Sequence, residues 1–233
     1  AYAVIDSVRA AQQIPGLGTG RNYALWGYSQ GGHAALFAAD LSRRYAPELN
    51  LMGVAAVAPP TSLDALLRAN LDTVPGRILA SFTLSSWSRK YGAPLGPLVD
   101  VQAARVVEEV GKSCIDDLGG QLDALAAQKG LEQRFLKADP GKVKPWSGLM
   151  AENSKFSLAA RVPTLIIQGD ADDIVRPQIT QAFVRASCRV GVPVRYVVLK
   201  GKGHSGAIKD GAKQATNWIA ARMAGKTIPS NCR

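Results

Sequence analysis

The chain has 233 residues, of which 47% are hydrophobic, 20% are charged and three are cysteines. This length is sufficient for one domain with a full core and leaves room for an inserted subdomain. No uninterrupted apolar run reaches the roughly 20 residues that a membrane-spanning helix requires, and the first residues lack a signal-peptide pattern.

The formal net charge of +10 is concentrated in the last quarter of the sequence. Residues 1–173 hold 17 basic and 17 acidic residues, whereas residues 174–233 hold 11 basic residues and a single acid, Asp210. A nucleic-acid-binding surface groups its basic residues into a patch or stripe. Here no basic run exceeds two residues and no aromatic residues are interleaved, so we interpret the excess as a solvated surface and expect no nucleic-acid partner.

The first sixty residues read as helix, strand, helix and strand. Apolar residues recur at helical spacing over 2–13, a short strand is expected at Tyr23–Trp26, and a helix rich in alanine is expected over 31–45. Leu51–Ala58 is a continuous apolar run that Pro59-Pro60 stops, which is typical of a parallel strand covered on both faces.

Residues 61–158 change character. Helical patterns at 62–71, 101–110 and 121–128 alternate there with glycine and proline breaks at 92–97, 119–120 and 140–148, and no buried strand is evident. We therefore predict a helical insertion, and we expect its tryptophans, Trp87 and Trp146, to serve in packing.

The strand and helix alternation returns after the insertion. The expected elements are a buried strand at Pro163–Gly169, a helix at Pro177–Arg189, a strand at Val194–Leu199, a glycine-rich loop at Lys200–Gly206 and a closing helix at Ile208–Met223. This order predicts a parallel α/β sheet with right-handed crossovers. Functional sites in such sheets lie at the carboxyl ends of the strands.

The pentapeptide Gly27-Tyr28-Ser29-Gln30-Gly31 lies between the first strand and the following helix. In this context G-x-S-x-G predicts a nucleophile elbow, in which Ser29 occupies a strained backbone position with its hydroxyl exposed. We expect both glycines of the motif to leave room where a Cβ would collide with a neighbouring element.

A serine nucleophile needs a base, and the sequence has two histidines, His33 and His204. His33 follows Ser29 by four residues on a helix that leads away from the hydroxyl, so we interpret it as structural. His204 follows the last strand, where a loop can carry it across the sheet edge to Ser29. We therefore predict that His204 is the base.

The acid that orients the base is expected after the preceding strand, where Asp170, Asp172 and Asp173 lie close together. We predict Asp172, because the turn after Gly169 needs about two residues to reverse direction. Asp170 and Asp173 are then turn-forming or helix-capping residues. The chain order Ser29, Asp172, His204 is that of α/β-hydrolases, and the N–H of Gln30 is the predicted oxyanion donor.

The three cysteines, Cys114, Cys188 and Cys232, have no zinc-site spacing, so we expect no metal, and the serine chemistry needs no cofactor. One pairing that we consider joins Cys232, near the chain end, to Cys188. Cys114 is then free or paired outside this chain.

Several segments of the chain resemble the secretory lipase family, the lipase A-like α/β-hydrolases of yeasts with bacterial relatives. The matching segments are GYSQGGHAA (27–35), AAVAPPTSLDALL (55–67), PTLIIQGDADDIV (163–175), GKGHSGA (201–207) and NWIAARMAGKTIPSNC (217–232). The resemblance implies an α/β-hydrolase core over 1–60 and 159–233, with 61–158 as a helical cap above an acyl pocket. It also implies Ser29, Asp172 and His204 as the triad, and a secreted protein with disulfides, which suits a Cys188–Cys232 bridge.

Family members carry further strands ahead of the nucleophile strand, and a loop there supplies the second oxyanion donor. This chain begins in the helix before Tyr23–Trp26, so we expect it to be the C-terminal portion of a longer protein with an incomplete sheet. That strand would be an open apolar edge, which we expect a missing N-terminal segment or a companion chain to cover.

The predicted function is hydrolysis of carboxylic esters, by an esterase or a lipase, on acyl esters or triacylglycerols with transient contact to a lipid interface. Two alternatives remain open. One is another acyl hydrolase, such as a peptidase, thioesterase or polyester hydrolase, because a triad does not choose the leaving group. The other is an inactive hydrolase-like fragment that acts only as a binding module.

Overall fold

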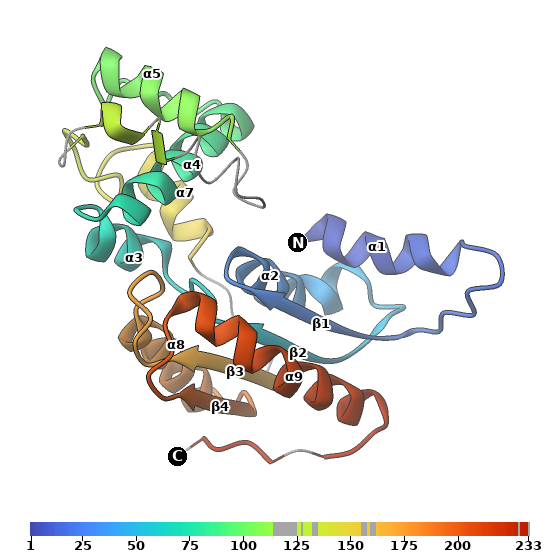
Figure 1. Ribbon diagram of the computed structural model, residues 1–233. Helices are drawn as coiled ribbons and strands as arrows, with labels where there is room; N and C mark the ends of the chain where they lie inside the picture. Colours follow the sequence, from blue (N-terminus) through green and yellow to red (C-terminus); the bar gives the residue numbers. More distant parts are fainter. Residues whose placement is uncertain are drawn as a thin grey trace. The chain divides into compact units, whose positions relative to one another are not determined.

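The computed structural model describes residues 1–113, 125–126, 128–131, 135–154, 158, 162–227 and 229–232 (Figure 1). The chain divides into two compact units. One, the sheet unit, comprises Ala1–Ser62 and Phe156–Arg233, and the other, the helical unit, comprises Leu63–Lys155. The position of Cys114 lies outside the described residues, as does most of the helix predicted over 121–128.

The sheet unit is built on four parallel strands in the order β1-β2-β3-β4. Their bounds are Asn22–Tyr28, Asn50–Val57, Thr164–Gly169 and Val194–Leu199. Each strand predicted from the sequence is confirmed, with ends that differ by at most two residues. Because all four strands run the same way, their carboxyl ends lie at the same end of the sheet (Figure 1).

Helices cover both faces of this sheet, and α2 and α9 lie on opposite faces (Figure 1). On one face pack α1 (Tyr2–Gln12), α2 (Gln30–Tyr45) and α8 (Pro177–Arg189), around the alternate strand residues that include Val54, Ala56 and Ile166. On the other face α9 (His204–Met223) packs on the intervening residues, among them Val57, Leu165 and Ile167. Two-sided cover explains why β2 reads as a continuous apolar run and why every residue of β3 is buried.

Strand β1 lies at one edge of the sheet, and only one of its faces is fully covered. Tyr23 and Leu25 are buried in the core under α2, whereas Trp26, which points the other way, is 48% exposed. The alternation of buried and exposed residues along β1 therefore shows that one face of this strand is only partly covered.

Strand β4 forms the other edge, and the C-terminal tail pairs with it. The backbone N–H of Asn231 donates to the carbonyl of Val194 at 3.0 Å. The Asn231 carboxamide accepts from the N–H of Tyr196 at 2.7 Å and donates to its carbonyl at 2.8 Å. A disulfide between Cys188 and Cys232 fixes the tail to α8, which confirms the pairing considered from the sequence.

The helical unit has α3 (Leu63–Asn70), α4 (Val74–Tyr91), α5 (Val101–Val110), the short 3-10 helix η1 (Gln128–Gly130) and α7 (Trp146–Glu152), and no strand among its described residues. Trp87 and Trp146 stack in its core, as expected, with ring centroids 6.4 Å apart. The Trp146 indole N–H donates to the carbonyl of Pro94. In the described part of the chain, no helix is both long and apolar enough to span a membrane.

Two helices of this unit correct the sequence interpretation. No helix was delimited from the sequence over α4, although its apolar residues Ile78 and Phe82 lie at helical spacing. The helix begins at a cap, where the Thr73 hydroxyl accepts from the N–H of Gly76 at 3.1 Å. The break expected over 140–148 also ends early, because α7 starts directly after Pro145, a position that proline tolerates well.

We expect the disulfide to stabilise the sheet unit, because it closes a loop of 44 residues and holds the tail on β4. Replacing both cysteines (Cys188→Ser with Cys232→Ser) should lower the free energy of unfolding by about 2–4 kcal/mol. Urea unfolding with and without reductant measures this. Reductant should destabilise the original chain and leave the double variant unchanged; equal effects on both would show that the bridge does not stabilise the fold.

Candidate active site

Ser29 lies between β1 and α2, directly after the carboxyl end of β1. Its backbone has φ 51° and ψ −122°, a region that side-chain-bearing residues rarely occupy. The conformation is held from both sides. The Ser29 N–H donates to the carbonyl of Val57 at 2.9 Å, and the Ser29 carbonyl accepts from the N–H of His33 at 3.0 Å. The backbone therefore stores strain at the predicted nucleophile.

The glycines around Ser29 do not have the equal roles that the motif suggested. A Cβ at Gly27 would lie 2.0 Å from the carbonyl oxygen of Gly31, so only glycine fits there. A Cβ at Gly31 would meet nothing within 4 Å outside its own surroundings in the helix, and the expected collision at this position is wrong. Gly32 has the second close approach, since its Cβ would lie 3.2 Å from both the Gly27 carbonyl oxygen and the Pro59 side chain.

His204 is the first residue of α9, and not part of a loop that ends at Gly206 as the sequence indicated. The glycines at 201, 203 and 206 suggested that loop. Gly201, with φ +67°, makes the turn after β4, Gly203 is the helix N-cap, and the helix then begins four residues earlier than predicted. Because His204 lies in the first turn of α9, the backbone that carries its imidazole is held in the helix.

Of the three aspartates after β3, the structure brings only Asp172 to His204. The Asp172 side chain is fully buried, and His204 Nδ1 lies 2.8 Å from its Oδ2. Asp170 instead pairs with the Lys200 ammonium at 3.1 Å and accepts from the N–H of Gly201, and these bonds lower the pKa of its carboxyl. Asp173 is exposed.

Ser29, His204 and Asp172 form one continuous hydrogen-bonded chain. His204 Nε2 lies 2.9 Å from Ser29 Oγ. An ionised carboxylate only accepts, so the proton on the neutral imidazole belongs to Nδ1, and Nε2 is left to accept from the Ser29 hydroxyl. His33, by contrast, stacks against Phe37 on α2, with ring centroids 4.8 Å apart.

Tyr28 belongs to this site, although no role was predicted for it from the sequence. Its ring lies against that of His204, with centroids 4.9 Å apart and planes at 35°. Burial, and after it the charge of Asp172, raises the pKa of the Tyr28 hydroxyl. The only signal in the sequence was its position beside Ser29 in the pentapeptide.

Gln30, the predicted oxyanion donor, is the first residue of α2. The N–H groups in the first turn of a helix have no partner within the helix and carry partial positive charge. The backbone of Gln30 therefore offers a donor beside the Ser29 hydroxyl.

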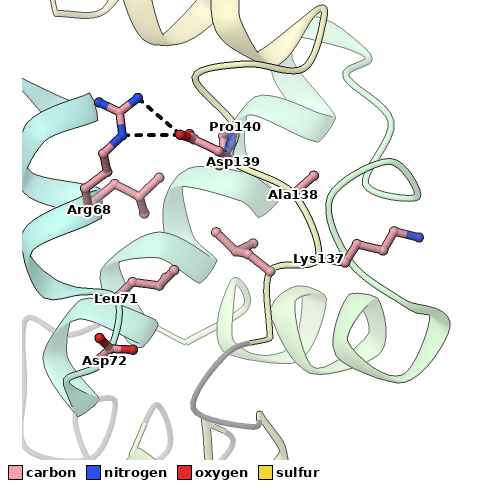
Figure 2. Close-up of a pocket in the computed structure, with 9 residues that line it drawn as sticks. Arg68, Leu71, Asp72, Lys137, Ala138, Asp139 and Pro140 are labelled. Carbon is pink, nitrogen blue, oxygen red and sulfur yellow. Dashed lines mark hydrogen bonds and ion pairs between the residues drawn. The ribbon is translucent and has the colours of Figure 1, made fainter.

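The helical unit has a surface hollow of its own (Figure 2). It is lined by residues of α3 and of the segment 136–140, and the Arg68 guanidinium crosses it to the Asp139 carboxylate at 3.2 Å. No serine, cysteine or histidine lines this hollow, so we assign no chemistry to it.

Comparison with known proteins identifies the family of this chain. The model of the secretory lipase family matches residues 1–231. The chain belongs to this family. It is 30% identical over 240 residues to "Lipase A" of Arthroderma benhamiae, an alignment that covers the whole chain and 50% of that protein. The chain spans about half the length of the relatives that it matches.

Solved structures give the fold. Candida antarctica lipase A in its closed state matches with a TM-score of 0.78 at 19% identity, over 99% of this chain and 55% of that one. A mutant of the rice cell wall degrading esterase LipA from Xanthomonas oryzae matches with a TM-score of 0.70 at 22% identity, over 95% of this chain and 63% of that one. The α/β-hydrolase fold predicted from the sequence is confirmed.

The unequal glycines of the elbow make a matched pair of variants. We expect Gly27→Ala to lower the free energy of unfolding by about 2 kcal/mol or more, because its methyl group overlaps a backbone carbonyl. Gly31→Ala, in open space on a helix, should be neutral or stabilising by about 0.5 kcal/mol. Urea unfolding of both variants measures the difference, and equal destabilisation would refute the assignment.

Proposed function

We propose that this protein hydrolyses carboxylic esters, with Ser29 as nucleophile, His204 as general base and acid, and Asp172 as the group that orients His204. The observation that carries the proposal is the hydrogen-bonded chain from Ser29 Oγ through the imidazole to the buried carboxylate. Membership in the secretory lipase family supports the ester as substrate.

In the acylation step, His204 Nε2 takes the proton of Ser29 as the oxygen attacks the ester carbonyl. The buried Asp172 carboxylate stabilises the imidazolium through Nδ1–H. The oxyanion of the tetrahedral intermediate accepts from the N–H of Gln30. His204 then returns its proton to the leaving alcohol, and the acyl group remains on Ser29.

In the deacylation step, a water molecule takes the place of the alcohol. His204 removes a proton from this water, whose oxygen attacks the acyl carbon and forms a second oxyanion at the same donor. Collapse of this intermediate returns the proton to Ser29 and releases the carboxylic acid.

Substrate and location follow from the family. Its members include proteins named as lipases, and a structural neighbour is named as an esterase, so acyl esters and triacylglycerols are the proposed substrates. We propose that the helical unit acts as the cap of the acyl site and contacts lipid interfaces transiently. The disulfide, a bond that persists in oxidising compartments, and the family together support a secreted protein.

The open edge at β1 suggests a partner of a different kind. The edge of a parallel sheet presents unpaired N–H and C=O groups, and Trp26 adds an exposed aromatic side chain beside them. We propose that a further strand, from a preceding segment or a companion chain, pairs with β1 in the working enzyme. That region would also supply the second oxyanion donor.

The test of the proposed function is covalent labelling with a fluorophosphonate probe, followed by hydrolysis of p-nitrophenyl esters of increasing chain length. We expect the probe to label Ser29, and Ser29→Ala to abolish both labelling and hydrolysis. Asp172→Asn should lower the labelling rate by about 10³–10⁴-fold, because the wrong imidazole tautomer is then favoured. Asp173→Asn is the matched control and should label at the original rate. Labelling that survives in Ser29→Ala would disprove the assignment.

The proposed strand partner predicts that this chain associates with itself through the β1 edge when expressed alone. Trp26→Lys should reduce that association, because a charge on an edge strand opposes strand pairing. Tyr91→Lys is a matched control, since Tyr91 is 49% exposed but ends a helix. Light scattering at increasing concentration measures the effect, and an equal reduction in both variants would count against a partner at β1.

A further inference from the structure

Gln168 is a fully buried polar side chain on β3, in the middle of the fold. Its carboxamide makes four hydrogen bonds. The Nε2 group donates to Asp172 Oδ2 at 3.0 Å, to the carbonyl of Val175 at 3.1 Å and to that of Gly169 at 3.3 Å. Oε1 accepts from the Thr180 hydroxyl at 2.9 Å. This side chain connects β3, the Asp172 turn and α8.

The contacts fix which way the carboxamide points. Three oxygen atoms surround Nε2, and a reversed amide would place Oε1 against all of them, including the carboxylate. The Thr180 hydroxyl supplies the donor that Oε1 needs on the other side. Thr180 is itself fully buried on α8. The orientation of Gln168 is therefore set by the network, from helix to strand to acid.

Asp172 receives four donors through this arrangement. Its Oδ1 accepts from the N–H groups of Ile174 at 3.0 Å and Val175 at 2.8 Å. Its Oδ2 accepts from Gln168 and from His204. Burial of a carboxylate without donors is costly, and here the backbone bonds hold one oxygen while Gln168 holds the other at the imidazole.

We propose that Gln168, held by Thr180, is a positioning residue that fixes Asp172 Oδ2 toward His204 and shares the negative charge of that oxygen. This inference rests on the proposed function, because it assigns to Asp172 the orienting role in that mechanism. Gln168 touches no reacting atom, and it acts on the base only through the carboxylate.

A measurable consequence concerns the protonation of His204. Without the Gln168 donor, the two backbone bonds still hold Asp172 Oδ1, and among the described contacts of Oδ2 only that with His204 is left. The negative charge on Asp172 Oδ2 is then no longer shared with the Gln168 donor, and it stabilises the His204 imidazolium more strongly. His204 would become a neutral base only at higher pH, so the acid limb of the rate profile should move upward.

Other charged groups near the carboxylate do not account for such a shift, because the variants leave all of them unchanged. Tyr28 on β1 faces His204, Asp170 and Asp173 belong to the same turn, and Arg176 precedes α8. From the segment after β4, Lys200 pairs with Asp170 and Lys202 pairs with Asp210.

The test uses Gln168→Met, which keeps the length of the side chain without the donor, and Thr180→Val, which removes only the hydroxyl that holds Gln168. Thr164→Val is the matched control. Thr164 is also fully buried on β3, but its hydroxyl donates to the carbonyl of Val162, away from the carboxylate. The Thr164→Val variant therefore loses a buried hydroxyl, with the accompanying loss of stability, and leaves the contacts of Asp172 unchanged.

We would measure the rate of fluorophosphonate labelling of Ser29 from pH 5 to 9. Gln168→Met should label about tenfold more slowly at the plateau, as expected for one lost hydrogen bond to a charged group. Its acid limb should move up by about 0.5–1 pH unit. Thr180→Val should shift in the same direction by less, and Thr164→Val should keep the original profile. Should Gln168→Met fail to fold, Thr180→Val and its control decide the question.

A second measurement is independent of activity. The chain has two histidines, so NMR titration of the ring protons follows His204 after assignment with a His33→Gln variant. The His204 midpoint should rise in Gln168→Met and Thr180→Val and stay fixed in Thr164→Val. Equal midpoints in all three would overturn the positioning role and leave the proposed function intact. An unlabelled Ser29 together with a shifted His204 midpoint would overturn the proposed function and retain the link from Gln168 to His204.

Discussion

The buried charge of Asp172 is the constraint around which the carboxyl end of the sheet is arranged. A fully buried carboxylate has to be surrounded by donors, and the four donors here come from three sources. Backbone N–H groups come from the turn that carries the acid, a carboxamide comes from β3, and the imidazole comes from the start of α9. The same hydrogen bonds that satisfy the charge therefore also set the direction of the imidazole.

The acid turn and the base turn are joined by their backbones as well as by these side chains. The N–H of Ala171 donates to the carbonyl of Lys202 at 3.1 Å, and the Asp170 carboxylate accepts from the N–H of Gly201. A Cβ at Gly169 would lie 2.1 Å from that same Lys202 oxygen, so the approach requires glycine. Asp170 is thus a structural link between the turns, which explains why a cluster of three aspartates contains one at the site and two outside it.

The sequence was informative where a single local signal determined the structure. Apolar residues predicted β2 and most of β3, because strands covered on both faces are predominantly apolar. The chain order of Ser29, Asp172 and His204 predicted that these side chains lie close together, because the carboxyl ends of parallel strands lie on the same side of a sheet. The candidate triad could be named for this reason, since each member lies within a few residues of the carboxyl end of a strand.

The sequence was less informative where structure depends on partners far along the chain. Three glycines after β4 read as a loop, yet the turn needs only Gly201, and α9 begins at His204 because Gly203 can cap a helix. Gly31 was expected to avoid a collision that only coordinates can assign, and the close contact belongs to Gly32. No role for Gln168 was predicted from the sequence, because its partners Asp172 and Thr180 come near it only once β3, the turn and α8 are placed together.

The two edge strands of the sheet differ in how their outer sides are covered. At β4, the tail supplies hydrogen bonds through Asn231, and the disulfide holds it there, so part of that edge is closed from within the chain. At β1, which leads directly into the strained Ser29, no described residue adds a further strand. The strained backbone conformation of Ser29 is maintained only if β1 stays in register with β2. The reason is that the Ser29 N–H donates to the carbonyl of Val57, the last residue of β2. Whatever pairs with the outer side of β1 would therefore hold the nucleophile as well as cover the edge.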